Sequence, residues 1–159
     1  TGGFTEVLLE HDIEKVLSID TGTDLLHSKL LSNAKVTNLD NCDFRKLTTS
    51  DLPFQPNVVV CDVSLISLTE IIKVCRTMLR GEYHFFGLIK PQFEMTEKFR
   101  VKNGIVKTDK WRIQAINKIT LTAKELGFQQ HGEVSTVAGD GVTTNLEYGI
   151  HLSIGETLN

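Results

Sequence analysis

Hydrophobic positions along the chain alternate between short unbroken runs and longer stretches with helical spacing. The short runs are rich in Val, Ile, Leu and Phe, and they predict strands at residues 15–20, 35–39, 57–62, 83–89, 128–136 and 143–154. Apolar residues three and four positions apart predict helices at residues 5–10, 22–31, 68–79 and 109–126. This regular alternation of strand and helix is typical of a parallel α/β sheet.

Three local signals refine this prediction. The run at 57–62 is apolar almost throughout, so we expect a central strand that is buried on both faces. The helix that follows begins with a capping-box pattern, Ser67 and then Glu70. The last two strands are joined by a glycine-containing turn at 137–141, which predicts an antiparallel hairpin. The predicted fold is therefore a doubly wound, mostly parallel α/β sheet with helices on both faces and an antiparallel final strand.

The beginning of the chain departs from the usual order of elements. A cofactor-binding α/β unit opens with a strand, continues through a glycine-rich turn and enters a helix. Gly2-Gly3 and a helical stretch are present, but no strand precedes them. We therefore expect that the chain lacks its first strand and that a gap separates the strands at Val16 and Val58. By itself the glycine pair fits a cloning linker equally well.

Composition describes an ordinary globular domain with an uneven charge distribution. The 159 residues are 40% hydrophobic and 23% charged, and the net charge of −3 does not favour nucleic-acid binding. Residues 90–118 nevertheless contain eight basic and three acidic side chains, a local charge of +5. Alone, this segment fits a solvated loop and helix face better than a binding surface. Beside a catalytic residue it would become a candidate for phosphate contacts.

Cysteine usage and hydropathy point to a cytoplasmic protein. Cys42, Cys61 and Cys75 match neither a zinc pattern nor a CxxC motif, so we predict reduced and mostly buried thiols, with no metal site. There is no secretory signal at the start of the chain. No apolar run approaches the roughly 18 residues that a membrane-spanning helix needs, and we expect no stable membrane insertion.

Charged side chains stand at the ends of the predicted strands, where open parallel sheets bind their ligands. Asp20 suits the hydroxyls of a ribose, which would serve a nicotinamide enzyme equally well. Asp43 suits either an exocyclic amine of adenine or a simple Asx turn. Asp62 and Lys90 end neighbouring strands, so we expect them to approach each other, as a structural salt bridge or as part of a site. Glu147 lies within the last strand.

Several of these residues belong to longer motifs. The chain reads DVSLISL at 62–68, LIKPQFE at 88–94 and NLEY at 145–148. These strings resemble the hemolysin A, or TlyA-like, branch of the FtsJ-type methyltransferases. The TGGFT at residues 1–5 resembles the end of that family's cofactor motif, and GIVK at 104–107 also fits. The resemblance runs along essentially the whole chain, with its motifs in the family's order and spacing.

The resemblance implies a Rossmann-like methyltransferase that uses S-adenosyl-L-methionine to methylate the ribose 2′-hydroxyl of ribosomal RNA, on cytidine in the better-known members. FtsJ-type enzymes carry a Lys-Asp-Lys-Glu tetrad, and Asp62, Lys90 and Glu147 match its last three members. The first lysine and a small S4-type RNA-binding domain would lie upstream of residues 1–159. The cofactor-binding residues implied by the resemblance are Gly2, Gly3, Phe4, Asp20, Asp43 and Asp62. Asp43 stands where many members carry Asn.

This interpretation gives the basic segment a role and leaves three alternatives. Lys98, Arg100, Lys102 and Lys107 would flank the substrate entrance and bind RNA, with ribosomal RNA or a ribosomal subunit as the partner and a homodimer as a possible assembly. The hemolysin name suggests a membrane-active toxin, although no strongly basic amphipathic helix is present. A nicotinamide-dependent dehydrogenase and a binding-only domain without catalysis are the other two alternatives.

Overall fold

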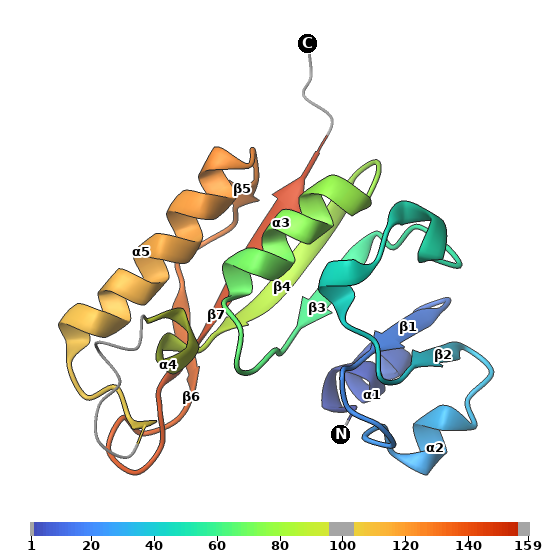
Figure 1. Ribbon diagram of the computed structural model, residues 1–159, viewed down its shortest axis with the longest axis horizontal. Helices are drawn as coiled ribbons and strands as arrows, with labels where there is room; N and C mark the ends of the chain where they lie inside the picture. Colours follow the sequence, from blue (N-terminus) through green and yellow to red (C-terminus); the bar gives the residue numbers. More distant parts are fainter. Residues whose placement is uncertain (1, 96–103, 156–159) are drawn as a thin grey trace. The chain divides into compact units, whose positions relative to one another are not determined.

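The computed structural model describes residues 2–95 and 104–155 and divides the chain into two compact units, Thr1–Asp51 and Leu52–Asn159. The elements of the first unit are α1 (Gly3–Glu10), β1 (Val16–Ile19), α2 (Ser28–Leu31), β2 (Val36–Leu39), η1 (Phe44–Lys46) and η2 (Thr49–Asp51). Those of the second are β3 (Val58–Cys61), α3 (Leu68–Met78), β4 (Tyr83–Ile89), α4 (Pro91–Glu94), α5 (Asp109–Glu125), β5 (Gln129–Gln130), β6 (Ser135–Ala138) and β7 (Glu147–Ile154). Figure 1 shows these elements coloured along the chain.

The first unit is built on two parallel strands, β1 and β2, which pair from Val16 opposite Val36 onward. Both strands and α1 lie where the sequence predicts them. The predicted helix at 22–31 is wrong over most of its length, because only Ser28–Leu31 is helical. Asp24 has a left-handed φ of 56°, which breaks the helix, and the backbone N–H groups of Gly22 and Asp24 donate to the carboxylates of Asp20 and Asp40 in a loop.

The second unit contains a five-stranded sheet with the order β3-β4-β7-β5, and β6 also pairs with β7. β3 and β4 are parallel, whereas β7 runs antiparallel to β4, β5 and β6. The predicted antiparallel pairing with the final strand is confirmed, but the strand expected at 128–136 is divided into β5 and β6, and β6 includes residues 137 and 138 of the predicted turn. β7, however, begins at Glu147 and not near Thr143, because the carboxylate of Asp140 holds the backbone N–H groups of residues 142–144 in a turn.

The prediction of a central, fully buried strand at 57–62 is wrong. β3 is an edge strand of its sheet, and Val58, Val59 and Val60 are only half-buried. Among the described residues no strand pairs with the outer edge of β3, and β1 and β2 form a separate sheet.

The hydrophobic core of the second unit lies between the sheet and two helices. α3 and α5 pack against each other and against β4 (Figure 1). Side chains of β4 alternate, so that Tyr83, Phe85 and Ile89 are buried beneath the helices while His84 and Phe86 are exposed on the opposite face. Among the residues that the structure describes, no helix is long and apolar enough to span a bilayer.

Candidate active site

Lys90 is the centre of a charged cluster in the second unit. Its Nζ lies 2.6 Å from Oδ1 of Asp62 and 3.8 Å from Oε1 of Glu147, and it donates a 3.3 Å hydrogen bond to Oγ of Ser64. The Lys90 side chain is 12% exposed, whereas those of Asp62 and Glu147 are 48% and 25% exposed. The lysine side chain is thus largely buried, while the carboxylates of its two partners remain accessible to solvent.

The sheet topology brings these three residues together. Asp62 directly follows β3, and Lys90 directly follows its parallel neighbour β4. β7 runs antiparallel to β4 with Ile89 opposite Tyr148, so Lys90 meets Glu147 at the start of β7. The approach of Asp62 and Lys90 that the sequence predicted is confirmed, and Glu147 joins them at the same sheet edge. Carboxyl ends of parallel strands are where open α/β sheets place their ligand-binding residues.

The loop after Asp62 adds two features that the sequence did not indicate. Ser64 supplies the hydroxyl that accepts from Lys90, although the motif gave this serine no role. Leu65 has a φ of 70° and is 85% exposed. A left-handed conformation is uncommon for a bulky side chain and is often found at functional sites. An apolar side chain therefore projects into solvent next to the charged cluster.

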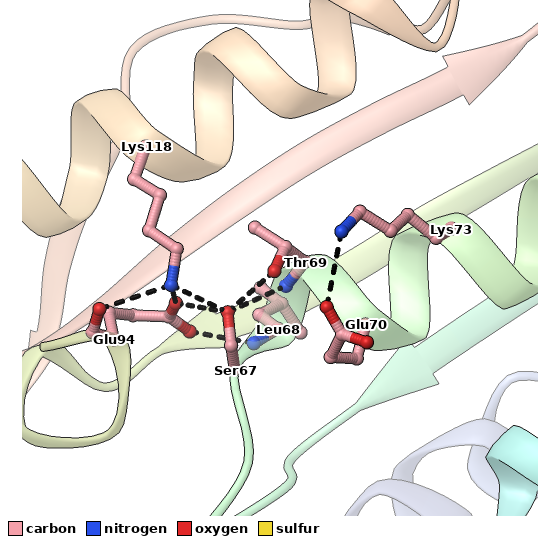
Figure 2. Close-up of polar contacts among 7 residues, drawn as sticks. All are labelled: Ser67, Leu68, Thr69, Glu70, Lys73, Glu94 and Lys118. Atoms are coloured by element: carbon pink, nitrogen blue, oxygen red, sulfur yellow. Dashed lines mark hydrogen bonds and ion pairs between the residues drawn. The ribbon is translucent and has the colours of Figure 1, made fainter. Parts of the chain in front are cut away.

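Glu94, at the end of the KPQFE motif, anchors the segment that follows Lys90. Its carboxylate accepts a 2.6 Å hydrogen bond from the backbone N–H of Leu68 and another from the hydroxyl of Ser67. It also forms a 3.0 Å ion pair with Nζ of Lys118 (Figure 2). Only 2% of the Glu94 side chain is exposed. A carboxylate at a helix N-terminus is stabilised by the unpaired N–H groups and the helix dipole. Glu94 thus fastens α4 to α3 and α5.

This arrangement corrects the capping box predicted for α3. Ser67 is the N-cap, as predicted, and its Oγ accepts from the N–H of Thr69. Glu70 instead forms a 3.2 Å ion pair with Lys73 on the exposed side of the helix (Figure 2). The carboxylate at this helix terminus comes from Glu94, a residue 26 positions away from Leu68.

A second network fixes the loop around Val106 to the motif that contains Glu147. The side-chain amide of Asn145 accepts from the N–H of Val106 and donates to the carbonyl of Gly104, both at 2.8 Å. The buried Arg112 donates to the carbonyls of Val106 and Gly141, at 3.0 and 3.3 Å. The turn before Asn145 requires glycine, because a Cβ at Gly139, which has a φ of 85°, would lie 1.9 Å from the Asn145 carbonyl oxygen.

Replacing Asn145 with alanine should release this loop without unfolding the sheet. Loss of two hydrogen bonds would cost about 1–3 kcal/mol and leave the Val106 N–H without its partner. Hydrogen exchange followed by mass spectrometry should therefore show faster exchange in peptides covering residues 104–106. Asn117→Ala, an exposed change on α5, is the control and should leave exchange there unaltered. Unchanged exchange in the Asn145 variant would contradict this assignment.

In the first unit, Asp20 and Asp43 follow the parallel strands β1 and β2. Oδ1 of Asp20 accepts from the N–H of Gly22 at 2.8 Å, while Oδ2 has no partner among the described residues. The two loops are joined by a backbone hydrogen bond from Cys42 to the carbonyl of Asp20. Asp20 therefore keeps an exposed acceptor for a ligand hydroxyl.

The carboxylate of Asp43, in contrast, already accepts several hydrogen bonds within the protein. It caps η1 and accepts three hydrogen bonds from Arg45, one from the backbone N–H and two from the guanidinium group. The bonds to Arg45 lower the pKa of Asp43 to about 2. This geometry corresponds to the Asx-type turn that the sequence left as an alternative, and an adenine contact would share the carboxylate with Arg45.

The glycine pair has a structural role at the start of α1. Gly2 has a φ of 95°, and a Cβ on it would lie 2.4 Å from Leu30 and 2.6 Å from Leu26. Both the backbone angle and the packing require glycine here, which argues against a linker. A Cβ at Gly3 would meet no atom within 4 Å, so its backbone is open to a ligand, and Phe4 is 38% exposed beside it.

Only part of the predicted basic surface can be located. Lys107 is exposed, next to the buried Val106. Lys98, Arg100 and Lys102 lie outside the described residues. Two other cations of the basic segment serve the fold: Arg112 pairs with Asp109 and backbone carbonyls, and Lys118 pairs with Glu94. Fewer cations of this segment are therefore available for phosphate contacts than its composition suggests.

Two of the three cysteines lie in the core of the second unit. All three are free, as predicted, and Cys61 and Cys75 are buried. Burial raises the pKa of the Cys61 thiol to about 12 and that of Cys75 further still. Both thiols therefore stay protonated at neutral pH.

Comparison with known proteins gives a consistent assignment. The model of the FtsJ-like methyltransferase family matches residues 1–143. Hemolysin A of Brachyspira hyodysenteriae is 31% identical over 97% of this chain and 64% of its own length. The 23S rRNA (cytidine-2′-O)-methyltransferase TlyA of Campylobacter jejuni is 31% identical over 93% of this chain and 56% of its own. A crystal structure of a protein from Lactococcus lactis described as a hemolysin has a TM-score of 0.88 and 34% identity, over 96% of this chain and 73% of that one.

The fold is thus of the Rossmann-like α/β class, with parallel strands and an antiparallel strand next to β4. The chain belongs to the FtsJ-like methyltransferase family. It spans about half to two thirds of the length of the curated relatives it matches.

Proposed function

We propose that this chain is the catalytic domain, residues 1–159, of an S-adenosylmethionine-dependent RNA 2′-O-methyltransferase that acts on ribosomal RNA in the cytoplasm. The observation that carries the proposal is the cluster of Lys90, Asp62 and Glu147 at one sheet edge, in a member of the FtsJ-like family. The named activity of the TlyA relative supports rRNA as substrate and a cytidine ribose as the methylated group. We also propose an S4-type RNA-binding domain upstream of these residues and a homodimeric assembly.

The implied cofactor residues of the first unit offer the kinds of groups that would bind the ribose and the backbone-facing part of S-adenosylmethionine. Asp20 offers an unpartnered carboxylate oxygen to the ribose hydroxyls, and Gly3 leaves its backbone open to close approach. When bound, the cofactor supplies a methyl group on a sulfonium centre, which is an activated electrophile that needs no further chemistry from the protein.

The residues of the charged cluster would act on the RNA ribose. Lys90 donates a hydrogen bond to the 2′-oxygen, which orients the hydroxyl and stabilises negative charge as the oxygen attacks. Asp62 and Glu147 fix the ammonium position and offer carboxylate acceptors for the proton that the hydroxyl loses. Ser64 adds a third contact that limits the rotation of the lysine side chain.

Calorimetric titration of S-adenosylhomocysteine tests the cofactor assignment directly. In the protein that contains these 159 residues we expect saturable binding, and Asp20→Ala should weaken it at least about tenfold, because a charge-assisted hydrogen bond contributes roughly 1.5–3 kcal/mol. Asp12→Ala, an exposed change in the turn after α1, should bind like the wild type. A folded protein that gives no saturable heat would overturn the cofactor assignment.

A further inference from the structure

Three histidines from distant parts of the chain meet on the open face of the second unit's sheet. His84 lies in β4, His151 in β7, and His131 immediately after β5. His84 is opposite Ser153 in the β4–β7 register, and Ser153 is opposite Gln129 in β5, two residues before His131. Residues two apart in a strand point to the same face, so the register places all three imidazoles on one face. This face is opposite to α3 and α5 (Figure 1).

The three rings lie close enough to share a ligand. Nδ1 of His84 and Nε2 of His151 are 2.9 Å apart, and one ligand nitrogen from each of the three rings lies within 4.8 Å of the other two. His131 uses Nε2 for a 2.8 Å hydrogen bond with Oγ of Ser153. The ring centroids of His131 and His151 are 4.5 Å apart. A hydrogen bond to one ring nitrogen commonly fixes the orientation of a histidine whose other nitrogen binds a metal.

We propose that His84, His131 and His151 form a binding site for a divalent transition-metal ion, with Zn²⁺ as the ion it fits best. Imidazole nitrogens suit Zn²⁺, and three protein ligands leave one position of a tetrahedral centre for water. His84 is exposed, so solvent reaches that position. Zn–N bonds of about 2.0–2.1 Å require ligand nitrogens roughly 3.3 Å apart, which small rotations of these side chains would provide.

The ion would stabilise the sheet and take no part in methyl transfer. His84 and Lys90 are six residues apart in and after β4, or roughly 20 Å at the rise of a strand. The ion would instead connect β4, β7 and the segment after β5, a strand of only two residues. The site therefore stands independently of the proposed activity.

Simple packing is the competing explanation. Phe86 stacks on His151 with centroids 4.2 Å apart, and the His84–His151 hydrogen bond already satisfies two ring nitrogens. In that case the imidazoles form an aromatic cluster and have no preference for metal ions. The two explanations differ in whether Zn²⁺ binds with defined stoichiometry and through all three rings.

Competition with a chromophoric zinc chelator measures binding to the metal-free protein. We expect one Zn²⁺ per chain, no binding of Mg²⁺, and visible absorption bands of a four-coordinate centre when Co²⁺ is used in place of Zn²⁺. His84→Gln, at the most exposed ring, and His131→Gln should each weaken Zn²⁺ binding more than about tenfold. Ser153→Ala should weaken it less and keep the Co²⁺ spectrum. His11→Gln, in the first unit, is the matched control and should bind like the wild type.

The outcomes separate the two explanations. Stoichiometric binding lost in both histidine variants, with circular dichroism showing that they are folded, would establish the site. Absence of saturable binding in the wild type, or equal affinity in the wild type and the His84 and His131 variants, would overturn it and leave the cluster as packing.

Discussion

Replacing Lys90 with alanine is expected to reduce methyl transfer to RNA by about 10²- to 10⁴-fold, the range typical for loss of a positioned group that acts on the reacting proton or charge. The variant should keep most of its affinity for S-adenosylhomocysteine, because all of the implied cofactor residues except Asp62 lie in the first unit. Transfer of a labelled methyl group to ribosomal RNA under single-turnover conditions measures the chemical step. Lys90→Arg should also lose most activity, since a planar guanidinium cannot occupy a position 2.6 Å from Asp62 and 3.3 Å from Ser64 in the same way.

Two controls separate catalysis from folding in this experiment. Lys124→Ala removes an exposed lysine from the last turn of α5 and should change neither transfer nor stability by more than a small factor. Lys90→Ala itself should remain folded, because Asp62 and Glu147 are solvent-accessible and can be hydrated when their partner is removed. If the folded Lys90 variant transferred methyl groups within about threefold of the wild-type rate, Lys90 would be a structural salt-bridge partner.

The geometry of this cluster could be predicted from sequence because it depends on strand order. Asp62 and Lys90 each end an apolar run, and the ends of neighbouring parallel strands meet at one edge. The antiparallel direction of β7 then brings Glu147 to the same edge from a distant position. The pattern was sufficient for the approach of Asp62 and Lys90, whereas the place of Glu147 in the site was implied only by the family motif.

Features that depend on contacts between distant side chains were not predictable in this way. The helix expected at 22–31 is interrupted because Asp24 takes a left-handed backbone conformation, with a φ of 56°, and its N–H donates to Asp40, 16 positions along the chain. Glu70 has the spacing of a capping residue, yet Glu94 occupies that position from another element. The three histidines could have been found because they lie on the same face of paired strands, but recognising this requires the register of β4, β5 and β7.

Glu94→Gln is expected to be the most destabilising of the conservative changes in this region. The carboxylate is almost completely buried and accepts from Leu68, Ser67 and Lys118 (Figure 2). An amide of the same shape loses the negative charge and directs its N–H₂ group toward groups that are themselves donors. Weakening the charge-assisted hydrogen bonds from Leu68 and Ser67, which contribute roughly 1.5–3 kcal/mol each, should cost about 3 kcal/mol in total. For a chain of this size the melting temperature should fall by roughly 6–12 °C.

Glu70→Gln provides a closely matched control, because it makes the same chemical change on the first turn of α3. Glu70 is exposed and, within residues 2–95 and 104–155, pairs only with Lys73, so its loss should alter stability by less than about 1 kcal/mol. Lys118→Met should fall between the two, since it leaves Glu94 its hydrogen bonds from Leu68 and Ser67 but removes the compensating cation. Equal melting temperatures for the Glu94 and Glu70 variants would mean that the contacts of Glu94 contribute little to stability. The position of α4, and with it that of Lys90, would then depend on the packing of Pro91 and Phe93 in the KPQFE motif.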